Sequence, residues 1–245
     1  MINVKQVSQP YGLTNVNCHI PPGKLVGIMG ANGAGKSTLL KSIAGILPLA
    51  NGEIWLNHYK LSEMTPRQKN EQLAYLAQNT AIQWDLSAYE VIALGLSYPL
   101  PPAKEQEKVR SISARFSVSA LLDKPFQQLS GGEKARVQLT RCCIKDAPLL
   151  LADEPIAPLD PYYQIDIMEQ LKSLTPKQTC VVAIHHLSLA YQFCDEVILL
   201  DKGKVLASGE TQAVLNAENL AKAFGVRAEF DLVRKEMLCV QKLES

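Results

Sequence analysis

Residues 30–38 read GANGAGKST, and this short stretch decides the fold. The apolar run before it, LVGIM at 25–29, reads as a buried strand, and apolar residues recur at helical spacing after Lys36. Glycines between a strand and a helix let the backbone form a loop whose N–H groups converge on an anion. The stretch matches G-x-x-x-x-G-K-[ST] and therefore predicts an α/β chain built on a phosphate-loop (P-loop) NTPase core.

Every residue of this loop is a candidate nucleotide ligand: Gly30, Ala31, Asn32, Gly33, Ala34, Gly35, Lys36, Ser37 and Thr38. The helix that begins near Lys36 adds unpaired N–H groups and the positive end of its dipole. We expect Lys36 to reach the β and γ phosphates and the Ser37 hydroxyl to ligate Mg²⁺. The cofactors predicted from this loop are ATP and Mg²⁺.

A second apolar stretch, LLLADEP at 149–155, ends in two carboxylates and a proline. In a parallel sheet, the carboxyl end of a strand lies beside the phosphate loop. Asp153 is therefore predicted to hold Mg²⁺ through its water shell. Glu154, one residue further on, is placed to polarise a water molecule for attack on the γ phosphate.

A third stretch, LSGGEKARVQLTRCCI at 129–144, opens a second helix with Ser130, Gly131 and Gly132. Such a helix N-terminus is another anion site. One nucleotide rarely needs two glycine-opened helix ends from the same chain. We therefore expect this one to serve a nucleotide held by a second copy, which predicts a dimer.

The composition names no partner by charge. The chain has 245 residues, 47% of them hydrophobic, and a formal net charge of +1, so we expect no nucleic-acid partner. No apolar run approaches the roughly 18 residues of a membrane span, and the N-terminal stretch lacks the apolar core of a signal peptide. The six cysteines form no C-x-x-C pair and are predicted to be mostly small buried side chains in a reducing compartment.

The order of these motifs resembles the ATPase subunit of an ATP-binding cassette (ABC) transporter over essentially the whole chain. GANGAGKST resembles its Walker A loop, LLLADEP its Walker B strand, LSGGE its signature, and APLD at 157–160 its D-loop. Gln78 matches the Q-loop glutamine. His185 matches the switch histidine and is preferred to His186, because the family places an aspartate about ten residues later, where Asp195 stands.

The resemblance implies a mechanism in which two copies close head to tail around two ATP molecules. Ser130 and Gly132 would then contact the γ phosphate of the partner's nucleotide. Gln78 would sense the metal and the water, and His185 would stabilise the charge of the transition state. An aromatic residue near the N-terminus stacks on adenine in this family. Tyr11 is the candidate here, with a plain surface tyrosine as the alternative.

Three positions depart from the family's usual pattern. Ala152 stands where a bulky aliphatic residue usually precedes Asp153. This change reduces apolar packing and leaves the catalytic groups unaltered. Pro158 stiffens the D-loop. His186 replaces the aspartate that commonly follows the switch histidine and is expected to be a surface or capping residue.

The domain organisation expected from the resemblance is a single ABC ATPase domain over 1–245. Its nucleotide-binding core spans 1–85 and 148–209, with 52–56 in an antiparallel β flank. Residues 86–147 form an inserted helical subdomain that carries the signature, and 210–245 form a tail of two short helices and a hairpin. The membrane partner is expected to dock at 78–100, where Trp84 and Tyr89 are either exposed contacts or packing of the helical subdomain.

The tail sequence NLAKAFGV and the signature LSGGE resemble ATPases that energise import of vitamin B12, haem or ferric siderophores, most of all vitamin B12. The expected protein is peripheral on the cytoplasmic face of the inner (cell) membrane. Its predicted partners are a second copy of itself, a multi-span transmembrane permease and, indirectly, a periplasmic or surface solute-binding protein. An exporter ATPase, an importer of another solute, and a soluble cassette protein of iron–sulfur assembly or DNA repair remain alternatives.

Overall fold

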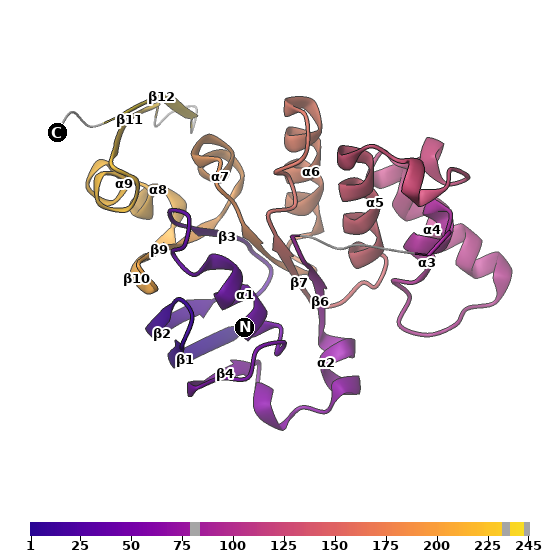
Figure 1. The fold of residues 1–245 in the computed structure, drawn as a ribbon, viewed down its shortest axis with the longest axis horizontal. Coiled ribbons are helices and arrows are strands. Elements are labelled where there is room, and N and C mark those ends of the chain that lie inside the picture. The colour runs from indigo at the N-terminus through magenta and orange to yellow at the C-terminus, as the bar shows by residue number, and fades with distance from the viewer. Residues whose placement is uncertain (79–83, 232–235, 243–245) are drawn as a thin grey trace.

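A twisted six-stranded sheet is the centre of the computed structural model, which describes residues 1–78, 84–231 and 236–242 (Figure 1). Its order is β10-β9-β3-β8-β7-β6, and all neighbours are parallel except β10 and β9. β3, β7 and β8 are buried along their whole length, as parallel strands covered on both faces must be. The strands are β3 (Leu25–Met29), β6 (Leu73–Leu76), β7 (Leu149–Asp153), β8 (Thr179–Ala183), β9 (Glu196–Asp201) and β10 (Lys204–Glu210).

A second, antiparallel sheet forms the predicted flank. Its order is β2-β1-β4-β5, and β4 pairs antiparallel with β1. Helix α1 (Lys36–Ile43) contributes to the apolar core that both sheets share, in which Val4, Ile28 and Leu39 are buried. The strands are β1 (Ile2–Gln9), β2 (Leu13–Ile20), β4 (Asn51–Leu56) and β5 (Tyr59–Lys60).

The other face of the large sheet is covered by α6 (Pro161–Leu174) and α7 (Leu187–Phe193), which share a core with α5 (Gly131–Cys143). The tail forms two short helices, α8 (Thr211–Val214) and α9 (Ala217–Phe224), and a hairpin of β11 (Val226–Asp231) and β12 (Glu236–Lys242), as predicted. The ring of Phe230 in the hairpin lies 5.0 Å from that of Tyr191 in α7. The hairpin therefore rests on the helix that follows His185.

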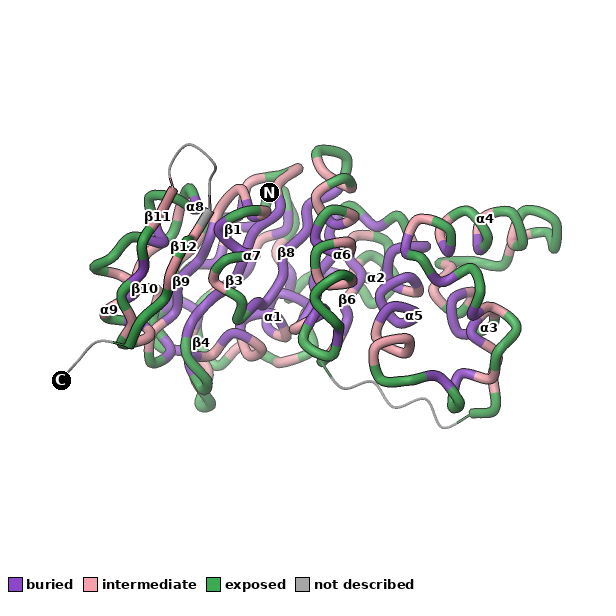
Figure 2. The backbone as a smooth tube through the Cα atoms, turned by 90° about the horizontal axis from the view of Figure 1, so that it is seen from above, coloured by how far each residue is buried: buried purple, intermediate pink, exposed green. Residues whose placement is uncertain are grey.

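The segment 86–147 is helical and packs around a small apolar core of its own. It contains α3 (Ala88–Ala93), α4 (Pro102–Arg115) and α5, with short 3₁₀ turns at Ser119–Leu121 and Phe126–Gln128. Figures 1 and 2 show these helices at one end of the molecule and the tail hairpin at the other. The predicted fold class, a phosphate-loop core with an antiparallel flank and inserted helices, is confirmed. Helix α2 (Pro66–Gln72) and the turn at Leu61–Glu63 complete the elements.

Candidate nucleotide site

The phosphate loop connects β3 to α1, as the sequence predicts. Gly33 and Gly35 have φ of 79° and 100°, which a residue with a side chain adopts only under strain. A Cβ on Gly35 would also lie 2.2 Å from the carbonyl oxygen of Gly12, in the turn between β1 and β2. The loop therefore owes its shape to glycine at these positions, and the β1–β2 turn is pressed directly against it.

Lys36 starts α1 and is buried beside the loop. Its Nζ donates to the carbonyl oxygens of Gly30 at 2.9 Å and Ala31 at 3.1 Å. Burial lowers the pKa of Lys36, while the charges of Glu154 and Asp153 act in the opposite direction. The ammonium group is thus held at the mouth of the loop, where its charge can meet the phosphates of a nucleotide.

Ser37 and Asp153 meet although 116 positions separate them in the chain. The Ser37 hydroxyl donates to Oδ1 of Asp153 at 2.9 Å. Asp153 ends β7, and burial raises its pKa while the Ser37 hydrogen bond lowers it. A hydroxyl beside a carboxylate is a set of hard oxygen donors, which fits Mg²⁺.

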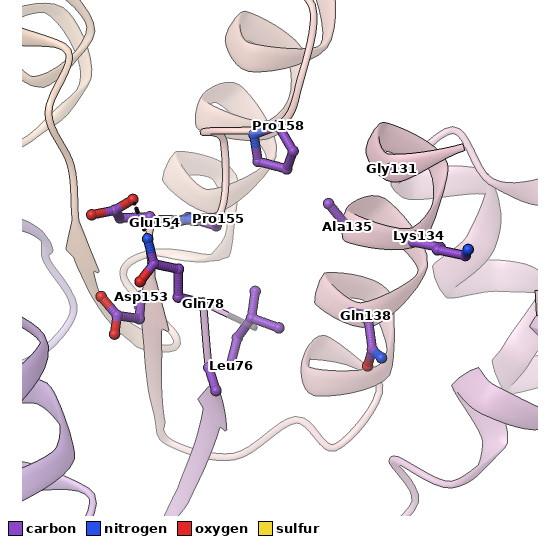
Figure 3. Close-up of a pocket in the computed structure, with 11 residues that line it drawn as sticks. Leu76, Gln78, Gly131, Lys134, Ala135, Gln138, Asp153, Glu154, Pro155 and Pro158 are labelled. Atoms are coloured by element: carbon purple, nitrogen blue, oxygen red, sulfur yellow. Dashed lines mark hydrogen bonds between the residues drawn. The ribbon is translucent and has the colours of Figure 1, made fainter. Parts of the chain in front are cut away.

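Glu154 follows Asp153 at the end of β7, and its side chain is hydrogen bonded to that of Gln78 (Figure 3). Gln78 donates from Nε2 to one carboxylate oxygen at 2.7 Å, and Nε2 of His185 is hydrogen bonded to the other at 2.5 Å. Its backbone N–H donates to Ala183 in β8 at 3.2 Å, and its φ is 54°, in the left-handed region. Non-glycine residues in this region cluster at functional sites, where surrounding structure holds them.

The structure brings His185, rather than His186, to Glu154. His186 is exposed and stands at the N-cap of α7, but its side chain makes no capping hydrogen bond there. Asp195, used above to choose between the two histidines, accepts a hydrogen bond from the backbone N–H of Leu25 at 2.9 Å and pairs with Lys172. Asp195 therefore ties the loop before β9 to the start of β3.

The signature opens α5 with a capping box. Ser130 accepts from the N–H of Glu133 at 3.3 Å, and the Glu133 carboxylate accepts from the N–H of Ser130 at 2.8 Å. A Cβ on Gly132 would lie 3.3 Å from the carbonyl oxygen of Pro158 in the D-loop, so the signature and the D-loop are neighbours within one chain. Gly131 lines the same pocket as Glu154.

A family profile described as ABC transporter matches residues 13–157. The chain belongs to the ABC transporter family. It is 35% identical over 230 residues to the hemin import ATP-binding protein HmuV of Bordetella parapertussis, covering 89% of this chain and 87% of that protein. It is 34% identical over 223 residues to the zinc transport system ATP-binding protein TroB of Treponema pallidum, covering 88% of this chain and 82% of that protein.

A dimeric ATP-binding cassette in a post-hydrolysis state, bound to ADP and Pi, superposes with a TM-score of 0.79 at 26% identity. The match covers 86% of this chain and 99% of that one. The chain is therefore an ABC ATPase and a nucleotide-binding protein. None of the helices in the described part of the chain combines the length and the apolar character that spanning a bilayer requires.

Tyr11 of this ABC ATPase lies in the β1–β2 turn and is 87% exposed. The neighbouring Gly12 reaches the phosphate loop, since a Cβ on it would lie 3.7 Å from both Gly35 and the Thr38 hydroxyl. The turn that carries Tyr11 is therefore close to the loop, and the Tyr11 side chain is open to solvent. Its stacking on adenine stays a prediction.

The segment predicted to meet a membrane partner is described only in part, because 79–83 lie outside the described residues. Trp84 is 69% exposed, as expected for a docking residue. Of the two alternatives for Tyr89, the structure favours packing of the helical segment, and the side chain is half-buried. Its ring packs against the apolar core of the helical segment and its hydroxyl donates to Glu105 at 3.1 Å, because its position on α3 faces that core.

Two further sequence expectations meet the structure. Ala152 is completely buried in the core between the sheet and the helices. Cys142, Cys143, Cys180 and Cys194 are buried free thiols, which confirms that most of the cysteines are core residues. Burial raises the pKa of Cys180 and of Cys194 to about 12.

Proposed function

We propose that this chain is the ATP-hydrolysing subunit of an importer for a metal chelate, with haem first and vitamin B12 or ferric siderophores as related solutes. It would work as a homodimer bound to a multi-span permease at the cytoplasmic face of the cell membrane, fed by a solute-binding protein. The observation that carries this solute class is the 35% identity to a hemin import ATP-binding protein over nearly the whole of both chains.

Hydrolysis is supported by the arrangement around Glu154. Its carboxylate, held by Gln78 and His185, is the group that would take the proton of the attacking water. The two contacts fix the carboxylate, and His185 would add a hydrogen bond to the charge that develops in the transition state. The strained backbone of Glu154 costs folding free energy. A functional reason for this strain is that it directs the carboxylate into the site.

The residues that would hold the cofactors surround that carboxylate. The phosphate loop and Lys36 would bind the phosphates of ATP, and Tyr11 would stack on its adenine. Ser37, Asp153 and Gln78 would hold Mg²⁺, which, when bound, neutralises charge on the phosphates. The hydrogen bond between Ser37 and Asp153 supports this set, because it brings the Ser37 hydroxyl and a carboxylate oxygen of Asp153 within 2.9 Å of each other.

The homodimer is supported by the signature helix. Ser130, Gly131 and Gly132 begin α5 with backbone N–H groups that an anion can use. These residues belong to the helical segment, whereas the phosphate loop belongs to the sheet, so a second copy is the natural supplier of the nucleotide they would contact. The post-hydrolysis structure with the same fold is dimeric, which supports this arrangement.

The permease would dock on the helical segment that follows the Q-loop in the chain. An open groove of about 580 Å³ lies there, lined by Leu94, Tyr98 and Glu90 among others. Leu94 and Tyr98 are exposed large apolar side chains, as is Trp84 at the start of the same segment. Apolar side chains gathered on an exposed face mark protein contact sites.

Zinc import is the second candidate, because the similarity to a zinc transport ATP-binding protein is almost as high. Reconstitution in lipid vesicles with the permease encoded beside this chain tests both. We expect haem, supplied with its binding protein, to raise ATP hydrolysis and to accumulate in the vesicles, and Zn²⁺ to do neither. Accumulation of Zn²⁺, a sugar or an amino acid in preference to every metal chelate would overturn the assignment.

A further inference from the structure

Gln138, on α5, is a buried polar residue that the mechanism above does not use. It is only 4% exposed, and neither its Nε2 nor its Oε1 has a hydrogen-bond partner within 1–78, 84–231 and 236–242. Buried side-chain amides are nearly always paired, so an amide with both ends unpaired requires a physical explanation. An apolar side chain of the same size would cost less at this position.

The pocket that Gln138 lines suggests the explanation. It has a volume of about 250 Å³ and is shared with Gln78, Asp153 and Glu154, which come from the edge strand β6, its neighbour β7 and the loops after them (Figure 3). On α5 the same pocket is lined by Gly131, Lys134, Ala135 and Gln138, which recur at helical spacing. One face of α5 thus runs from the signature to Gln138 along the catalytic residues.

The position of Gln138 along the axis of α5, relative to strand β6, can be derived from a neighbouring contact. One turn further on, the Cys142 thiol donates to the carbonyl oxygen of Tyr75 in β6 at 3.6 Å. Four residues of helix rise about 6 Å, and two residues of strand rise about 6.6 Å. Because α5 and β6 run in opposite directions in Figure 3, Gln138 lies level with Ala77, where β6 ends and the Q-loop begins.

We propose that Gln138 is a positioning residue for hydrolysis, which hydrogen bonds to the backbone of Gln78 at the start of the Q-loop when the nucleotide-bound dimer closes. This inference rests on the proposed function. α5 is one continuous helix, so a movement that brings Ser130 to the partner's nucleotide also moves Gln138 along the start of the Q-loop. The amide then holds the segment whose side chain, Gln78, contacts Glu154.

A hydrogen bond in the closed dimer would explain why Gln138 carries an amide that is unpaired in this structure. In the structure the pocket lies between the amide and the Q-loop segment, so the amide costs stability there. In the closed dimer the pocket narrows and the amide gains its partners. Gln138 therefore favours the closed arrangement relative to the open one, and the gain appears in the rate of hydrolysis rather than in the stability of the free chain.

The test is Gln138→Met, which keeps the length and approximate volume of the side chain and removes both hydrogen-bonding groups. We expect kcat for ATP hydrolysis by the purified chain to fall about tenfold, the effect of one net hydrogen bond, with KM for ATP changed less than about twofold. The midpoint of thermal unfolding should stay the same or rise, because a buried unpaired amide is lost. Gln138→Leu should behave in the same way.

Leu139→Met is the matched control, since it is a volume-conserving change at the next residue, which is buried in the main core. We expect its kcat to stay near that of the wild type. The inference is overturned if Gln138→Met and Gln138→Leu keep the wild-type kcat, or if kcat and the unfolding midpoint fall together. A wild-type chain that does not hydrolyse ATP would instead overturn the proposed function, and this inference with it.

Discussion

Replacing Glu154 by glycine, alanine or glutamine separates the backbone strain of this residue from its chemistry. The φ of 54° places Glu154 in the left-handed region, which costs a residue with a Cβ about 1–2 kcal/mol. Glycine avoids this cost, but the greater conformational entropy of its unfolded chain lowers the free energy of unfolding by about 0.4–1 kcal/mol. The glycine and alanine variants both lose the contacts to Gln78 and His185. The free energy of unfolding should therefore be about 1 kcal/mol larger for Glu154→Gly than for Glu154→Ala.

Thermal unfolding of the nucleotide-free chain measures this difference. About 1 kcal/mol shifts the midpoint by roughly 2–4 °C in a chain of this size, with glycine the more stable variant. This order is the reverse of that in ordinary helices and strands, where glycine is the less stable residue. An alanine variant that unfolds at or above the glycine variant would refute the strain.

The chemistry is measured on the same set of variants. All three should lose steady-state ATP hydrolysis by about 10²-fold or more, the usual contribution of a positioned general base. Glu154→Gln should still bind Mg-ATP, because the phosphate loop is untouched. A Glu154→Gln chain with near wild-type turnover would contradict the role of Glu154 as the base.

Three further predictions concern binding, assembly and docking. Lys36→Ala should weaken equilibrium binding of ATP itself, by about tenfold or more, because it removes a cation from the phosphates; unchanged affinity would contradict its placement. Lys36→Ala and Ser130→Arg chains, each inactive alone, should regain up to about a quarter of wild-type activity when mixed in equal amounts, since half the dimers are mixed and each has one intact site; no recovery would argue against shared sites. Trp84→Glu should weaken co-purification with the permease while leaving ATP binding unchanged, and unchanged co-purification would remove Trp84 from the docking surface.

Local patterns explain which parts of the site could be predicted from the sequence. The phosphate loop and the strand that ends at Asp153 are continuous stretches, and glycine spacing or an apolar run identifies them directly. The family motif order then placed Gln78 and His185, which the structure brings to Glu154. These predictions needed no knowledge of how distant segments pack.

The features that were missed depend on packing between segments far apart in the chain. Glu154 has a left-handed backbone conformation, and its N–H donates to the carbonyl oxygen of Ala183 in the neighbouring strand. No local sequence pattern reveals either feature. For Tyr89 the sequence left a surface contact and core packing open, and only the structure shows that its side of α3 faces the helical core. Gln138 stood out in no motif, because its significance is the lack of a partner among the described residues.

Helix α5 connects the three parts of the site that must act together. Its first turn holds the signature, and its middle carries Arg136, whose guanidinium stacks 3.8 Å from the ring centroid of Tyr163 in α6. Helix α6 begins directly after the D-loop, so this cation–π contact ties the signature helix to the D-loop helix. The Gln138 face of α5 lines the same pocket as the start of the Q-loop. A displacement of α5 by nucleotide at the signature would therefore reach the D-loop through Arg136 and, once the proposed Gln138 hydrogen bond forms, Glu154 through the Q-loop, because one helix carries all three residues.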